Sequence, residues 1–388
     1  MNAPRRNLLP VIPFLLLVTT LLVACGGNGA DETGSNGPLA SDAATTPTIG
    51  PNGHFAEAQV AEDGTRHLIP LDAIRNGGPP KDGIPSIDAP RFAGADTWEK
   101  LGYNGENLVI GVEVNRVRRA YPFQVIVWHE IVNDVIDGKP LLISYCPLCG
   151  TGIVFEPEVD GEAVEFGVSG QLYNSDLLMY DRKTDSLWSQ VTGTAVVGEA
   201  TGAVLPLYPS EIMTWDDWQA TYPDSEVLTT DTGHTRNYAT DPYGGYYEDG
   251  DLWFPVSGLD ARLPVKERIT GVEIDGTAYG AYPDTAVLEH GPVNDTLGDV
   301  PLLVVADPDA GNTIRVFERQ IEGLTLTFQV SDDGASLVDD ETGSHWSFAG
   351  EATGGDLAGS RLPEVIPVKG FWFAWFAFHQ DTELWQPQ

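Results

Sequence analysis

The residues of this chain best suited to a chemical role are two cysteines three residues apart. Cys146 and Cys149 flank Pro147, and Gly150 follows them directly. Proline fixes one backbone torsion and glycine allows a tight turn, so both thiols can point to the same side. The pair could form a structural disulfide, act as a redox-active dithiol, or bind a soft metal ion. Copper is the favoured ion, because thiolates select soft metals.

Each of these alternatives has a further requirement. A redox dithiol or a catalytic thiol needs a lowered thiol pKa, from a helix N-terminus or a nearby cation. The pair stands between predicted strands, and the nearest candidate cations by sequence are His129 and Arg182. A structural zinc site is disfavoured, because the chain has no second Cys-x-x-Cys to complete it. Cys146, Cys149 and His129 therefore remain the candidates for a catalytic role.

The sequence repeats itself at an offset of about 160 residues, and the second copy lacks the cysteine pair. The Ala-Tyr-Pro of 120–122 returns at 281–283, and His129 corresponds to His290. In the same register Asp307 stands opposite Cys146 and Ala310 stands opposite Cys149. Features that both copies share are expected to be scaffold. Features that only the first copy keeps are better candidates for function.

A second difference between the copies lies near residue 172. The first copy holds four extra residues, 171–174, that the second copy lacks. Their loss together with the cysteines predicts one site, in which Tyr173 and Asn174 line a pocket and contribute to ligand or cofactor binding. Gln190 joins these candidates, because the second copy has Phe348 at the corresponding position. Independent drift of a decayed copy is the alternative explanation.

His129 and Met179 complete the candidate metal ligands, alongside Cys146 and Cys149. Met179 offers a thioether, and Leu337 replaces it in the second copy. A methionine in a strand is more often a core residue. His129 has an imidazole, but the second copy keeps His290 at the same place, which also fits a structural role.

Strand signals dominate the body of the chain. Residues 108–114 and 124–128 read as strands, 141–145 as a buried strand that delivers the cysteines, and 177–189 as a hairpin. One short helix is expected at 209–220. The fold class is therefore mainly β, with two tandem, sequence-related domains, barrel-like or sandwich, each with one short helix. The expected boundaries are 55–228 for the first domain, 229–266 for a connecting loop and 267–388 for a degenerate second domain.

The N-terminus predicts a lipoprotein of the cell envelope. Residues 1–24 combine Arg5 and Arg6 with an apolar run that ends in Leu-Val-Ala before Cys25. We expect cleavage there, lipidation of Cys25, and a flexible tether over 25–54. The net charge of −36 excludes nucleic acid as a partner, so the expected partners are the membrane and a soft metal ion or a thiol.

Several blocks of the chain resemble a bacterial family known as domain of unknown function 3179. The blocks are 128–134 (Trp-His-Glu-Ile-Val-Asn-Asp), 145–151 (Tyr-Cys-Pro-Leu-Cys-Gly-Thr), 166–182 and 187–190 (Leu-Trp-Ser-Gln). The resemblance covers roughly residues 55–385 and implies no established activity. The function expected is therefore soft-metal binding or thiol redox at the cysteine pair. The alternative is an interaction protein in which Cys146 and Cys149 form a structural disulfide.

Overall fold

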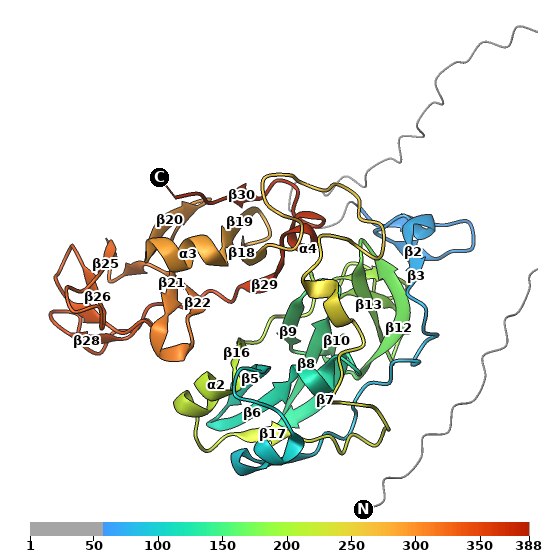
Figure 1. Cartoon of the computed structure of the whole chain (residues 1–388). Coiled ribbons are helices and arrows are strands. Elements are labelled where there is room, and N and C mark those ends of the chain that lie inside the picture. Colours follow the sequence, from blue (N-terminus) through green and yellow to red (C-terminus); the bar gives the residue numbers. More distant parts are fainter. Residues whose placement is uncertain (1–56, 388) are drawn as a thin grey trace, which may run out of the picture. The chain divides into compact units, whose positions relative to one another are not determined.

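The computed structural model describes residues 57–387, and its strands there form eight sheets (Figure 1). The protein is mainly β, as the strand patterns predicted. All described residues lie within one compact unit. Within the same range, no helix is long and apolar enough to cross a membrane. The predictions for residues 1–24, for Cys25 and for the tether 25–54 lie outside the described residues.

The first half of the body contains three larger sheets and one two-stranded ribbon. Their strand orders are β16 (Glu211–Thr214), β5 (Leu108–Val114), β6 (Val117–Pro122), β17 (Glu226–Leu228) and β4 (Phe92–Gly94); β7 (Ile131–Ile136), β8 (Lys139–Cys146) and β9 (Thr151–Phe155); β1 (Gln59–Val60), β2 (Arg66–His67), β15 (Ala195–Val197), β14 (Leu187–Ser189), β13 (Asp176–Asp181), β12 (Phe166–Tyr173) and β3 (Arg75–Asn76); and β10 (Glu158–Val159) with β11 (Glu162–Ala163). Figure 1 shows the long strands β12 and β13 side by side, as their pairing requires.

The second half also has four groups of strands, although its two largest sheets have four strands each against five and seven in the first half. The groups are β29 (Val368–Phe371), β18 (Arg268–Ile274), β19 (Ala278–Pro283) and β30 (Glu383–Leu384); β20 (Val293–Leu297), β21 (Val300–Asp307) and β22 (Thr313–Glu318); β25 (Phe328–Val330), β26 (Leu337–Asp339), β27 (His345–Trp346) and β28 (Ala352–Gly354); and β23 (Gln320–Ile321) with β24 (Leu324–Thr325). Even the parallel pairing of β17 with β6 has a counterpart, in the pairing of β30 with β19.

Side-chain hydrogen bonds also recur between the halves. The amide of Asn133 brackets Phe166, accepting from its N–H at 2.9 Å and donating to its carbonyl at 2.9 Å. Asn294 does the same to Phe328, accepting from its N–H at 2.8 Å and donating to its carbonyl at 2.9 Å. Two further bonds recur, those of Tyr121 to Asp134 and Tyr282 to Asp295, and those of Trp188 to Asp181 and Trp346 to Asp339. These repeated residues hold the scaffold together in both halves.

Each half contains two short α-helices rather than the single one expected. They are α1 (Phe123–Ile126), α2 (Trp215–Thr221), α3 (Asp284–His290) and α4 (Trp372–Phe376), and the short 3-10 helices are η1 (Leu71–Ala73), η2 (Ala95–Thr97), η3 (Glu99–Leu101), η4 (Gly244–Tyr247) and η5 (Pro308–Ala310). The strand predicted at 124–128 is wrong, because α1 occupies most of it. Pro122, in extended conformation, ends β6 and precedes the helix, which buries Val125 and Ile126. Burial of these two side chains outweighs the strand preference of a β-branched run.

Strand β8, which leads to the cysteines, is apolar because both of its faces are covered. Leu142 and Cys146 belong to one hydrophobic core, while Ile143 and Tyr145 belong to another. Alternate residues of a strand point to opposite faces, so β8 lies between two cores. This explains the continuous apolar run of 141–145 and places Cys146 in the interior.

Candidate metal centre and its cavity

The two cysteines lie on a tight turn between β8 and β9. Cys146 ends β8 and pairs with Thr151, the first residue of β9. Within the turn, the N–H of Cys149 donates to the carbonyl of Cys146 at 3.2 Å. Gly150 has a φ of +63°, a left-handed conformation that glycine adopts without strain. Both thiols are free and buried, with 1% of Cys146 and 0% of Cys149 exposed.

The hairpin of β12 and β13 brings its tip to this turn. Asn174 and Ser175 form a two-residue loop with φ values of +53° and +64°, as a type I′ turn requires. The carbonyl of Ser175 then accepts hydrogen bonds from the thiols of Cys149, at 3.5 Å, and Cys146, at 3.8 Å. The four residues that the second half lacks, 171–174, lengthen this hairpin. In the second half β25 has three residues where β12 has eight.

Asp176, the first residue of β13, completes a cluster with the two cysteines. One ligand atom from each of Cys146, Cys149 and Asp176 lies within 4.8 Å of the others, and all three residues are buried. The Asp176 carboxylate accepts from the Ser189 hydroxyl at 2.6 Å through Oδ2. Its Oδ1 is buried without a hydrogen-bond partner. None of the ion pairs formed among residues 57–387 includes Asp176.

Burial shifts the ionisation of Asp176 and Cys149 towards the protonated forms. Desolvation raises the pKa of Asp176 to about 8, and hydrogen bonds from the Ser189 hydroxyl and from backbone N–H groups of residues 177, 190 and 191 oppose the shift. Desolvation also raises the pKa of the Cys149 thiol well above its usual value, and the hydrogen bond with Cys146 raises it further. Two thiols and one carboxyl group are thus packed together in the interior. A bound metal ion would reverse this preference, because it favours the deprotonated ligands.

Tyr173, Asn174 and Gln190 lie around the cluster as supports. Tyr173 is buried in the same hydrophobic core as the cysteines. The side-chain oxygen of Asn174 accepts from the N–H of Ser257 at 2.9 Å, and this bond ties the hairpin tip to the connecting loop. Gln190 accepts from the Thr151 hydroxyl at 2.6 Å, beside the cysteine turn. The structure therefore brings the hairpin tip, Gln190 and the cysteines into one region.

His129, Met179 and Arg182 have other surroundings. His129 is fully buried, and its ring nitrogens are hydrogen-bonded to the Pro85 carbonyl at 2.7 Å and the Tyr238 hydroxyl at 2.8 Å. Desolvation lowers the pKa of His129 to about 4. Met179 belongs to the same hydrophobic core as the cysteines, but it is three residues from Asp176 on β13, so its side chain points to the face opposite that carboxylate. Arg182 forms ion pairs with Asp88 and Glu165.

The equivalence of His129 and His290 does not extend to their environments. His290 ends α3 and is exposed, with its ring 6.3 Å from that of Trp385. His129 is instead enclosed by the connecting loop, because Tyr238 belongs to that loop. The hydrogen-bond network around His129 therefore belongs to the first half.

Asp176 was not among the residues singled out from sequence, although a signal for it existed. Aligning Asp181 with Asp339 places Asp176 opposite Gly334, so at this offset the second half has neither the carboxylate nor the cysteines. The same comparison that selected residues 171–174 would have selected Asp176 as well. Its value as a ligand follows from burial, which the sequence does not show.

An apolar cavity of about 450 Å³ reaches the cluster at Cys146. Glu130 also borders it, is 5% exposed, and accepts a hydrogen bond from the Tyr243 hydroxyl at 2.9 Å. Desolvation raises the pKa of Glu130 to about 7, and its φ of +59° is a strained conformation for a non-glycine residue. Strained, buried acids of this kind concentrate at functional sites. The remaining aromatic walls are Trp128, Trp253 and Phe254.

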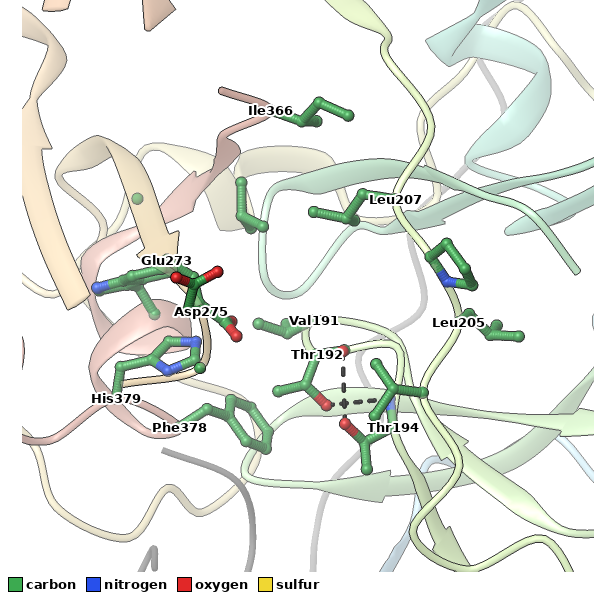
Figure 2. A pocket seen from close by; sticks show the side chains of 16 residues that line it. Val191, Thr192, Thr194, Leu205, Leu207, Glu273, Asp275, Ile366, Phe378 and His379 are labelled. Atoms are coloured by element: carbon green, nitrogen blue, oxygen red, sulfur yellow. Dashed lines mark hydrogen bonds between the residues drawn. The ribbon is translucent and has the colours of Figure 1, made fainter. Parts of the chain in front are cut away.

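A separate cavity of about 300 Å³ lies where the two halves face one another (Figure 2). Figure 2 shows Glu273, Asp275 and His379 on one side and Thr192 and Thr194 on the other. Its lining includes neither cysteine, so it is distinct from the cluster.

The second half supports the cysteine turn directly. The N–H of Phe371 donates to the carbonyl of Cys149 at 2.9 Å. A side chain on Gly370 would place its Cβ 2.4 Å from the Thr151 methyl group and 3.2 Å from the Cys149 carbonyl. Strand β29 therefore lies against the turn at a position that only glycine fits.

Replacing Gly370 by alanine is expected to destabilise the protein by about 1–3 kcal/mol, the usual cost of overpacking. The new methyl group would collide mainly with the Thr151 methyl group. Adding Thr151→Ser removes that methyl group but keeps the hydroxyl that bonds Gln190. The double variant should therefore recover most of the stability that Gly370→Ala loses. Chemical denaturation of both variants measures the effect. Equal stability of Gly370→Ala and wild type would contradict this packing.

The fold and the site define a mainly-β protein with a buried pair of thiols, a buried carboxyl group and an adjoining apolar cavity. A family model described as "Protein of unknown function (DUF3179)" matches residues 81–382, so the chain belongs to that family. The family assignment suggested by the sequence blocks is thereby confirmed. No curated protein and no solved structure matches the chain.

Proposed function

We propose that this protein binds one thiophilic metal ion through Cys146, Cys149 and Asp176. The observation that carries the proposal is the cluster itself, three buried acidic ligand atoms within 4.8 Å. Buried acids are normally neutralised by a cation or by hydrogen bonds, yet Oδ1 of Asp176 has no hydrogen-bond partner. A metal ion would replace the protons of these groups and would take up the free oxygen.

The alternatives explain less of this arrangement. A redox dithiol works through an exposed thiolate with a lowered pKa, whereas burial raises the pKa of Cys149. A structural disulfide would staple the turn, but it gives Asp176 no role. Neither alternative accounts for the loss of Asp176 from the second half together with the cysteines.

The ligand set favours zinc(II) over copper(I). Two thiolates suit both ions, but a carboxylate oxygen is a common ligand of zinc(II) and a poor one for soft copper(I). Zinc is disfavoured by the sequence only for a structural site made of two Cys-x-x-Cys pairs. Three protein ligands instead leave one coordination position open, as in catalytic zinc sites. Copper(I) held by Cys146 and Cys149 alone is the second candidate.

The open position would face the apolar cavity that Cys146 borders. A small molecule with an apolar body could enter there and present one polar atom to the ion. Glu130, with a pKa of about 7, could accept or donate a proton at the same cavity. The site thus has the parts of a metal-dependent binding or catalytic centre.

The location proposed for this site is the outer side of a membrane. The Leu-Val-Ala-Cys sequence that ends at Cys25 is typical of a lipoprotein cleavage site. Together with the tether expected over 25–54, it supports a lipid-anchored protein of the cell envelope. In such a compartment a bound metal ion would protect the two thiols from oxidation to a disulfide. The acidic body, with a net charge of −36, would stay away from anionic headgroups and nucleic acid.

The two halves are, on this proposal, copies of one unit, and only the first is equipped to bind metal. Matching strand orders and matching hydrogen bonds support this relationship. In both halves an indole also covers a glycine, Trp218 over Gly111 and Trp375 over Gly271. The position of Cys146 is taken by Asp307, which forms an ion pair with Arg315 at 2.7 Å. The second half would then serve as a support for the first.

The metal content of the full chain, purified without oxygen, tests the proposal when it is measured together with the reactive thiols. We expect one equivalent of zinc or copper, with the Cys146 and Cys149 thiols protected from alkylation until a chelator is added. A metal-free protein with a Cys146–Cys149 disulfide would contradict the proposal and favour the structural disulfide. A metal-free protein with rapidly exchanging thiols would favour redox chemistry.

A further inference from the structure

A larger cavity, of about 640 Å³, lies beside the opposite face of the strand that carries the cysteines. Tyr145 lines it, and a strand turns consecutive side chains to opposite faces, so Tyr145 points away from the side of Cys146. Helix α1, the connecting loop and β18 supply most of the other walls. The polar and charged side chains at these walls are those of Tyr103, Asn107, Gln124, Tyr238, Thr240, Asp241, Tyr247, Lys266 and Arg268.

Three polar atoms in this wall are buried without a hydrogen-bond partner. They are the hydroxyls of Tyr103 and Tyr247 and the side-chain oxygen of Gln124. Each such atom costs about 1–3 kcal/mol unless something pairs with it. Three of them at one cavity indicate a molecule that supplies the pairing. The Gln124 oxygen can only accept, so that molecule must carry a hydroxyl or amine donor.

Arg268 adds a positive charge to the wall of this cavity. Its guanidinium lies 5.6 Å from the centre of the Phe371 ring, and it takes part in none of the ion pairs found within residues 57–387. Lys266, beside it, is already engaged by Asp249 at 3.0 Å and by the Asp251 carbonyl at 2.7 Å. Arg268 is therefore the group available to an anion.

We infer that this cavity binds a small hydroxylated anion. The guanidinium of Arg268 would hold a carboxylate or phosphate group, which its planar geometry matches. Gln124 and Tyr103 would then pair with the hydroxyl groups of the same molecule. The volume falls within the range of small-molecule sites. Asp241 stands at the cavity too, but its carboxylate accepts the N–H of Tyr243 at 2.7 Å, which holds it in the loop.

Calorimetric titration of the full chain tests this inference. The probes are D-gluconate and glycerol 3-phosphate, which separate a carboxylate from a phosphate ligand. D-Glucose serves as the uncharged control, and hexanoate as the control without hydroxyl groups. We expect one of the two anions to bind at least about tenfold more tightly than either control, and Arg268→Met to reduce that binding at least about tenfold. Methionine keeps the packing on Phe371 but removes the charge.

Two further variants separate a ligand site from a structural role. Tyr103→Phe and Gln124→Met each remove an unpaired polar atom, so each should weaken anion binding yet raise the melting temperature of the empty protein. The Met179→Leu variant should bind the anion unchanged, because Met179 does not line this cavity. The inference is overturned if neither anion binds at 20 mM, if Arg268→Met binds as well as wild type, or if both polar-to-apolar variants melt earlier.

Discussion

Replacing Cys146 and Cys149 together by serine is expected to lower the affinity for zinc(II) by at least about 1,000-fold. Even changes outside the ligand shell commonly cost 10- to 100-fold in metal affinity, and this variant removes two of the three ligands. Serine is similar in size and can donate to the same Ser175 carbonyl that both thiols reach. The metal-free variant should therefore unfold within a few degrees of the metal-free wild type.

Competition with a chromophoric chelator at a fixed pH measures this affinity. The thiol of Cys25 must not bind zinc in this measurement. Either the lipidated protein is used, or Cys25→Ser is introduced into the wild type and into every variant. Met179→Leu is the matched control, because Met179 is buried on the opposite face of β13 and Leu337 fills the equivalent position. The control should bind zinc as wild type does. A double-serine variant that keeps its zinc affinity would refute the proposed ligands, and one that only melts earlier would favour a structural disulfide.

The second large effect is expected from Asp176→Asn, which should change metal selectivity. Loss of the carboxylate ligand is expected to lower the affinity for zinc(II) at least about 100-fold. Copper(I) affinity should stay within about threefold, because thiolates alone satisfy that ion. Equal losses for the two ions would contradict the separate roles assigned to the carboxylate and the thiols.

The same substitution is expected to stabilise the metal-free protein at pH 8. The pKa of Asp176 is about 8 in the folded protein against 3.8 for an ordinary aspartate, so the folded state holds a proton that the unfolded state releases. The free energy of unfolding therefore falls as the pH rises from about 4 to about 8, by on the order of 5 kcal/mol from this group. Asparagine does not ionise, so the free energy of unfolding of the variant should not show this part of the decrease with pH.

Denaturation curves of the two metal-free proteins at pH 5 and pH 8 measure the effect. Glu130, with its pKa raised to about 7, contributes the same pH dependence to both chains, so their difference isolates Asp176. A variant whose stability falls as much as that of the wild type would show that Asp176 is not buried as a protonated acid. At one fixed zinc concentration and pH 8, zinc should stabilise the wild type more than the variant, because the stability gained on binding grows with affinity.

The local geometry of the cysteine turn was predictable from the sequence. The apolar run of 141–145, Pro147 and Gly150 together indicate a strand that ends in a tight turn, and β8 has that form. Comparison of the two halves also selected residues 171–174, which do form the hairpin tip beside the cysteines. These features depend on backbone preferences and on residue differences between the copies, both of which the sequence records.

Tertiary packing decided which side chains surround the thiols. Asp176 was an unremarked acid in the sequence and became a candidate ligand only because the hairpin buries it against the turn. His129 looked like a ligand, yet the connecting loop brings Tyr238 to its ring and takes up its second nitrogen. The strand predicted at 124–128 became a helix because burial of Val125 and Ile126 outweighed local preference.

The sequence by itself therefore determined the mainly-β class, the family, the cysteine turn and the difference between the two halves. The tertiary structure alone decided the identity of the third candidate ligand, the raised pKa values of Asp176 and Glu130, and the two cavities beside β8. The physical reason is that desolvation and charge pairing depend on segments far apart in the chain. Asp176 and Cys146 are thirty residues apart, and only their shared burial makes them one site.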